Sequence, residues 1–177
     1  KIFQSTMKDI SQGLKTTYNA SAIAVVPGGG TFGMEAIARQ FATNKKSLVI
    51  RNGWFSYRWS QILDQGEIAS EIIVAKATKD KKNQDAAFSP ARIEDVVKKI
   101  KSEKPSLVFA PHVETSSGIL LPENYLRNVA DAIHSVGGIF VLDCVASGAL
   151  WVDMKKTGVD VLLSAPQKGW SSSPCCG

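Results

Sequence analysis

Cysteine, histidine and long apolar runs are all scarce in this chain of 177 residues. Its three cysteines, Cys144, Cys175 and Cys176, show no C-x-x-C spacing, and only two histidines accompany them, which disfavours a zinc site and a disulfide framework. No run approaches the roughly 18 to 20 apolar residues that span a bilayer, and the polar N-terminus is unlike a secretory signal. These absences predict a cytoplasmic protein with reduced thiols and no membrane partner.

The charge balance is modestly basic, with 21 Lys and Arg against 16 Asp and Glu. The lysines gather in KATKDKK and VVKKIKSEK, where acidic residues are interleaved with them. This pattern is typical of a solvated loop and a solvated helix face, so we expect no nucleic-acid partner. The length and the apolar content of 44% are sufficient for one domain with a sizeable core, covering residues 1–177.

Short β-branched runs alternate with helical periodicities along the chain. Strands are expected at 22–26, 47–50, 71–77, 106–110, 139–143 and 160–164. Helices are expected at 34–41, at 54–63, from an N-cap at Ser89 with Pro90 as first helical residue, and from Pro122 to Gly137 and Gly138. The alternation predicts an α/β fold, a three-layer α/β/α arrangement with a mostly parallel sheet.

The uncommon residue clusters lie directly after the predicted strands. PGGGT follows the first strand, RNGWF the second, PHVETSSG the fourth, CVAS the fifth and APQK the sixth. In an open parallel sheet, ligands bind along the edge formed by the carboxyl ends of the strands. We therefore expect a ligand site at this edge.

The segment VVPGGGTFGMEAIARQF contains Gly28-x-Gly30-x-x-Gly33, the spacing of a dinucleotide-binding fingerprint. A dinucleotide site also needs an acidic residue at the end of the next strand, and that strand ends in Arg51 and Asn52. The NAD hypothesis therefore fails. Glycines that enter a helix leave backbone N–H groups free for an anion, so the segment predicts either a phosphate site or a plain turn.

An acid and a lysine follow two other apolar strands. Asp143 is either a cap or the partner of a cationic ring nitrogen. Lys168 is either a surface lysine or a partly desolvated amine that forms a Schiff base. Trp54 or Phe55 either packs in the core or stacks on a ring. A lysine, an acid, a phosphate cradle and an aromatic face are together what pyridoxal 5′-phosphate requires.

The segments GGGTFGMEA, RNGWFSYR, HVETSSGI, VLDCVASG and VDVLLSAPQKGW resemble, in order and spacing, the class V aminotransferases of the fold-type I pyridoxal-phosphate family. The resemblance is closest to the serine–pyruvate and alanine–glyoxylate group and covers nearly the whole chain. It implies the large cofactor-binding domain of a longer, homodimeric enzyme. The upstream N-terminal segment and a small C-terminal domain, whose arginine grips the substrate carboxylate, would lie outside this chain.

The resemblance also implies a role for each matching residue. Lys168 would form the Schiff base and move the proton, and Asp143 would keep the pyridine nitrogen protonated. The other implied cofactor contacts are the phosphate cradle of Gly29, Gly30 and Thr31 with Gln167, the stacking Phe55, the ring-oxygen contact Thr115, and Val145 on the ring's other face. Pro166 departs from the family pattern, in which a small residue often precedes this turn.

The implied activity is transfer of an amino group from a small amino acid, such as serine or alanine, to glyoxylate or pyruvate. The nearest alternative is a 2-aminoethylphosphonate transaminase, which is similar in this half of the chain. A class V desulfurase or lyase is disfavoured, because Gln167 and Phe55 stand where desulfurases usually have histidine. Outside the family, the alternative is a non-catalytic domain that binds a phosphate ligand.

Overall fold

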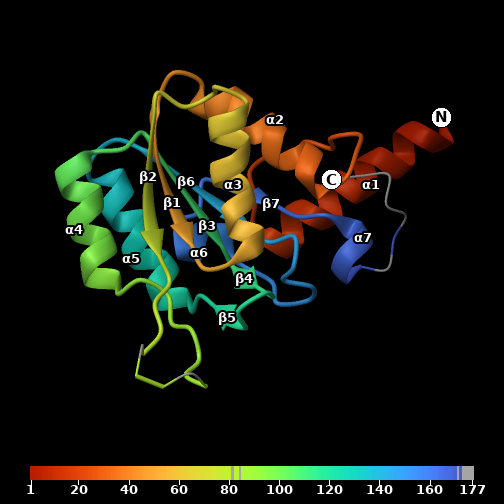
Figure 1. Ribbon diagram of the computed structural model, residues 1–177. Coiled ribbons are helices and arrows are strands. Elements are labelled where there is room, and N and C mark those ends of the chain that lie inside the picture. Colours follow the sequence, from red (N-terminus) through yellow and green to blue (C-terminus); the bar gives the residue numbers. More distant parts are fainter. Residues whose placement is uncertain (81, 84, 171, 173–177) are drawn as a thin grey trace.

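Five strands form the central sheet of the computed structural model, which describes residues 1–80, 82, 83, 85–170 and 172 (Figure 1). They are β1 (Lys46–Arg51), β2 (Glu71–Lys76), β3 (Leu107–Pro111), β6 (Ile139–Asp143) and β7 (Val161–Leu163). Their order is β2-β1-β3-β6-β7, and every neighbouring pair is parallel. A small antiparallel hairpin follows β3 and consists of β4 (Val113–Glu114) and β5 (Ile119–Leu120).

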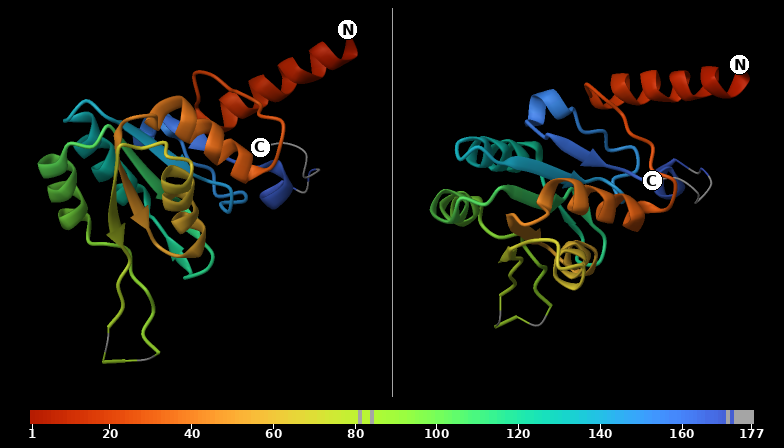
Figure 2. Two further views of the ribbon diagram at one scale, coloured as in Figure 1. Left: turned by 45° about the horizontal axis from the view of Figure 1, so that its top comes forward. Right: turned by 90° about the horizontal axis from the view of Figure 1, so that it is seen from above.

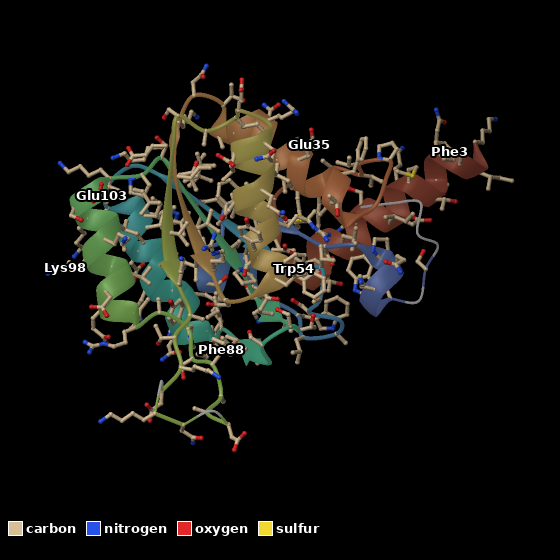
Figure 3. The ribbon with its side chains drawn as sticks, in the orientation of Figure 1. Phe3, Glu35, Trp54, Phe88, Lys98 and Glu103 are labelled. Carbon is tan, nitrogen blue, oxygen red and sulfur yellow. The ribbon has the colours of Figure 1, made fainter. Side chains whose placement is uncertain are left out.

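Helices cover both faces of this sheet (Figures 1 and 2). One face carries α2 (Gly30–Ala42) and α3 (Trp54–Gln65), and the other carries α4 (Ile93–Glu103) and α5 (Glu123–His134). Two short helices, α6 (Met154–Thr157) and α7 (Pro166–Gly169), flank β7 in the chain. The first helix, α1 (Ile2–Tyr18), projects from the body, with Phe3 near its far end (Figures 2 and 3). The predicted three-layer α/β/α fold is confirmed.

The core is divided by the sheet into two apolar layers, because successive strand residues point to opposite faces. Val49 and Phe109 face α2 and α3, where Trp59 packs against them. Leu48 and Val108 face the opposite way, toward α4 and α5. Within the described part of the chain, no helix is both long and apolar enough to cross a membrane.

Two of the predicted elements are wrong. Residues 22–26 form no strand, because these mostly exposed residues pair with no strand of the sheet. The helix expected at Ser89 begins instead at Ile93. Ser89 and Thr78 exchange backbone hydrogen bonds (2.8 and 2.9 Å), which keep residue 89 extended. The acidic first turn of Glu94 and Asp95 then favours the later start.

Candidate active site

The candidate residues gather at the carboxyl edge of the sheet. After β1 the chain adds β2 on one side and then returns to place β3 on the other side. Such a reversal of strand order opens a crevice in which open α/β sheets bind ligands. The segments after β1, β3, β6 and β7 all begin at this edge, as the sequence predicts, but the glycine segment at 27–31 follows no strand of the sheet.

Asp143 ends β6 and is only 9% exposed. Its carboxylate accepts two hydrogen bonds, one from Trp59 Nε1 at 3.1 Å and one from the Val145 backbone N–H at 3.0 Å. Burial raises the pKa of Asp143 above its ordinary value, and these two bonds offset the rise only in part. A buried acid with so few donors is suited to a cationic partner.

The glycine cradle lies at the start of α2. Gly29 is the N-cap, and no described side chain caps this helix end. A Cβ on Gly29 would meet no atom within 4 Å, so the space beside it is open. A Cβ on Gly30 would lie only 3.1 Å from Val145 Cγ2 and 3.4 Å from Ala165 Cβ. The open side of the cradle therefore offers the backbone N–H groups of a helix start to an anion.

Helix α3 connects this cradle to the acid. Arg58 donates a hydrogen bond from Nη1 to Thr31 Oγ1 at 2.9 Å, and the adjacent Trp59 donates to Asp143. Sequence reasoning missed both residues. The available signal was the requirement that the buried Asp143 find donors, which a tryptophan N–H on a helix packed beside the same strand can meet.

Lys168 lies on α7, which begins at Pro166. Its backbone N–H donates to the carbonyl of Ala165 at 3.2 Å, and Ala165 in turn lies beside Gly30. The lysine helix is therefore adjacent to the glycine cradle. Lys168 and the neighbouring Gln167 are both exposed. The partial desolvation expected for the lysine from the sequence is therefore not found.

The two aromatic candidates begin α3, at the end nearest β4 (Figures 1 and 3). Trp54 is 63% exposed and Phe55 is 40% exposed, so neither is a core residue. The Phe55 backbone N–H donates to Glu114 Oε1 at 3.1 Å. Thr115 directly follows Glu114 and is exposed in the turn between β4 and β5. Glu114 therefore links the predicted stacking and ring-oxygen residues.

The remaining histidines and cysteines add little chemistry. His112 is buried at the same edge of the sheet, and burial lowers its pKa. His134 lies in the last turn of α5, as predicted. Burial raises the pKa of the Cys144 thiol to about 12, whereas Cys175 and Cys176 lie outside the described residues. Among the residues that are described, no group of three His, Cys, Asp or Glu side chains could hold a metal ion.

The family model described as aminotransferase class-V matches residues 1–173, so the chain belongs to this family. A 2-aminoethylphosphonate–pyruvate transaminase of Paraburkholderia xenovorans strain LB400 is 29% identical to it, covering 93% of this chain and 42% of the relative. The alanine–glyoxylate aminotransferase of Rattus norvegicus is 27% identical, covering 95% of this chain and 38% of the relative. The chain thus spans about two fifths of the length of these curated relatives.

Solved structures agree with this assignment at the level of the fold. The ureidoglycine–glyoxylate aminotransferase of Bacillus subtilis superposes with a TM-score of 0.81, covering 99% of this chain and 43% of that chain, at 20% identity. Together the comparisons confirm the predicted family and the predicted fold.

Proposed function

We propose that this chain is the pyridoxal phosphate-binding domain of an enzyme that transfers an amino group between a small amino acid and a small keto acid. One observation carries the proposal. Val145 packs against Gly30 of the anion cradle, and its backbone N–H donates to the buried Asp143. A single residue therefore joins a site suited to a phosphate and an acid suited to a ring cation, the two ends of this cofactor.

Each binding group has a physical task in this proposal. The backbone of Gly29 and Gly30 and the hydroxyl of Thr31 bind the phosphate, and Gln167 assists beside them. Asp143 holds the proton on the ring nitrogen, because a cationic partner stabilises the charged form of its buried carboxylate. When bound, pyridoxal phosphate supplies an electron sink for the negative charge that develops at the substrate's α-carbon.

The remaining residues orient the ring and move the proton. Val145 and Phe55 pack on its two faces, and Thr115 contacts the ring oxygen. Lys168 would hold the cofactor through its aldehyde, and its amine, once the substrate's amino group has displaced it, would carry the proton that leaves the substrate's α-carbon. An exposed position on α7, beside the cradle, leaves this amine accessible to the aldehyde.

The amino donor in this proposal is serine or alanine, and the acceptor is glyoxylate or pyruvate. The name of the rat relative, which pairs alanine with glyoxylate, supports this choice. A second candidate donor is 2-aminoethylphosphonate, which the Paraburkholderia relative supports at 29% identity. The proposal includes a cytoplasmic homodimer, in which an N-terminal segment and a small domain outside this chain complete the site.

Reductive trapping tests the proposal in the full-length protein. The protein is incubated with pyridoxal phosphate, reduced with borohydride and digested, and the labelled peptide is mapped by mass spectrometry. The label is expected on Lys168, and Lys168→Ala is expected to abolish it. Lys156→Ala, at an exposed lysine paired with Glu123, is the matched control and should be labelled normally. A label at another lysine, or none, would contradict the proposal.

The substrate is tested separately with a panel of amino donors. Alanine, serine and 2-aminoethylphosphonate are each supplied with glyoxylate and with pyruvate, and the loss of keto acid is followed. Fastest turnover with alanine or serine supports the first candidate, and fastest turnover with 2-aminoethylphosphonate supports the second. Release of sulfide from cysteine would instead revive the desulfurase alternative.

A further inference from the structure

Glu114 is a fully buried carboxylate to which the proposed chemistry gives no role. Its Oε1 accepts from the Phe55 N–H (3.1 Å) and the Ser116 hydroxyl (2.6 Å), and its Oε2 accepts from the Ser56 N–H (2.8 Å) and hydroxyl (2.6 Å). Burial alone would raise the pKa of Glu114, but these donors lower it below its ordinary value. The carboxylate is therefore charged at neutral pH.

These donors belong largely to the first turn of α3, whose backbone amides have no acceptor within the helix. The N-cap residue is Gly53, which has no side chain to accept them. The Trp54 N–H donates to Ser116 Oγ at 2.8 Å, while the Phe55 and Ser56 N–H groups donate to Glu114. The β4–β5 hairpin thus caps the helix from outside, and the charge of Glu114 complements its positive end.

The hairpin approaches the helix backbone closely at Gly53. A Cβ there would overlap the Ser116 hydroxyl and would lie 2.8 Å from Glu114 Cγ. The Ser56 hydroxyl also accepts from the Asn52 and Gly53 N–H groups, at 2.8 and 3.0 Å. One polar network therefore joins the end of β1, the start of α3 and the hairpin.

We propose that Glu114 is a positioning residue that fixes Phe55 and Thr115 relative to each other. Phe55 is held by the hydrogen bond from its own backbone to Glu114, and Thr115 is held as the next residue in the chain. Phe55 and Glu114, the residue before Thr115, are separated by 59 positions, so chain connectivity alone does not set the spacing of Phe55 and Thr115. The inference rests on the proposed function, in which both residues contact the cofactor ring.

The affinity of the full-length protein for pyridoxal phosphate tests this role. Glu114→Gln keeps the size of the side chain but turns an amide N–H₂ toward groups that are themselves donors. We expect the dissociation constant for pyridoxal phosphate to rise about tenfold. Glu103→Gln, at an exposed glutamate at the end of α4 and away from Trp54 in Figure 3, is the matched control and should change it less than about twofold.

A double-mutant cycle separates positioning from general destabilisation. If Glu114 acts through Phe55, then Glu114→Gln added to Phe55→Ala should weaken cofactor binding by no more than about threefold beyond Phe55→Ala alone. If the two effects multiply in full, Glu114 acts independently of Phe55 and the proposal is wrong. Should Glu114→Gln fail to fold, Ser116→Ala replaces it in the cycle, because it removes one donor to the carboxylate.

The outcomes distinguish this inference from the proposed function. If the unmodified protein binds pyridoxal phosphate at Lys168 but Glu114→Gln binds it as tightly as Glu103→Gln, only the positioning role fails. If the unmodified protein does not bind pyridoxal phosphate, both fail together. Weakened binding that is also non-additive with Phe55→Ala supports both.

Discussion

Two buried carboxylates lie at the carboxyl edge of the sheet, and their surroundings shift their pKa values in opposite directions. Asp143, at the end of β6, accepts two hydrogen bonds, and its pKa is raised. Glu114, in the hairpin after β3, accepts four, and its pKa is lowered. Burial penalises charge at both positions. At Asp143 this penalty outweighs the two hydrogen bonds, whereas at Glu114 the four hydrogen bonds outweigh it.

We interpret the difference as one between Asp143, the proposed binding group for the cofactor, and Glu114, the proposed supporting group. Glu114 has its charge satisfied within the chain, which is what a fixed structural acceptor requires. Asp143 has its charge satisfied only in part, so a cation brought by a ligand would stabilise it further. Pairs of acids whose pKa values are driven apart are a recurring feature of active sites, where they take different roles.

Removing the charge of Asp143 should have the largest effect on activity. We expect Asp143→Asn to reduce transaminase activity of the full-length protein by roughly a thousandfold, because the ring nitrogen loses its counter-charge. Circular dichroism of the variant should match that of the unmodified protein. Steady-state kinetics with saturating cofactor measure the loss, and a variant that kept more than a tenth of the activity would contradict the role of Asp143.

Removing Glu114, whose carboxylate accepts four hydrogen bonds, should instead have the largest effect on stability. Glu114→Ala leaves the Phe55 and Ser56 amides at the start of α3 without their acceptor. We expect the free energy of unfolding to fall by about 3 kcal/mol, measured by urea denaturation. The surface control Glu103→Ala should cost less than about 0.5 kcal/mol. Equal losses in the two variants would remove the proposed distinction.

The two acids should also give opposite pH dependences in the cofactor-free protein. The pKa of Glu114 is lowered from 4.5, so its ionised form stabilises the fold above that pH, and this contribution is lost as the pH falls through the folded-state pKa. The pKa of Asp143 is raised from 3.8, so its ionisation costs stability as the pH rises from 3.8 through the folded-state pKa.

Urea denaturation across this pH range measures both contributions. The stability advantage of the unmodified protein over Glu114→Gln should therefore be largest at neutral pH and should shrink in acid. Its stability relative to Asp143→Asn should change in the opposite sense, falling as the pH rises. Parallel pH profiles for the two variants would be inconsistent with the contrast.

The smallest expected effect comes from removing one donor to Asp143. Trp59→Phe deletes the indole N–H bond to the carboxylate but keeps a ring beside Phe109, whose centroid lies 4.6 Å from that of Trp59. We expect a loss of about 1 to 2 kcal/mol in the free energy of unfolding. Trp151→Phe, at a tryptophan that is half exposed, is the control and should cost less. No loss in Trp59→Phe would mean that the bond does not stabilise Asp143.

The strands and the edge that carries the site were predictable because buried β-branched runs and their punctuation are local signals. Residues 22–26 show the limit of those signals, since a β-branched run becomes a strand only where a neighbouring strand receives it. The start of α4 was misplaced because the pairing of Ser89 with Thr78 is not visible in the sequence around Ser89.

In the candidate site, too, some residues were predictable from local sequence signals and others were not. Asp143 and Lys168 were visible as polar residues that end apolar runs. Glu114 lies within one of the segments that resemble the family, but no sequence pattern indicates its role, although a buried acid at this position also needs hydrogen-bond donors. Three of its four donor groups come from residues 55 and 56, nearly sixty positions away, so the contact between Glu114 and the start of α3 is visible only in the folded chain.

A crystal structure of the full-length protein with pyridoxal phosphate would test the central contrast most directly. We expect the ring nitrogen to lie within about 3 Å of an Asp143 carboxylate oxygen. We also expect Glu114 to remain bonded to the start of α3 and not to touch the cofactor. A ring nitrogen that faced Glu114, or that lay beyond hydrogen-bond reach of Asp143, would contradict it.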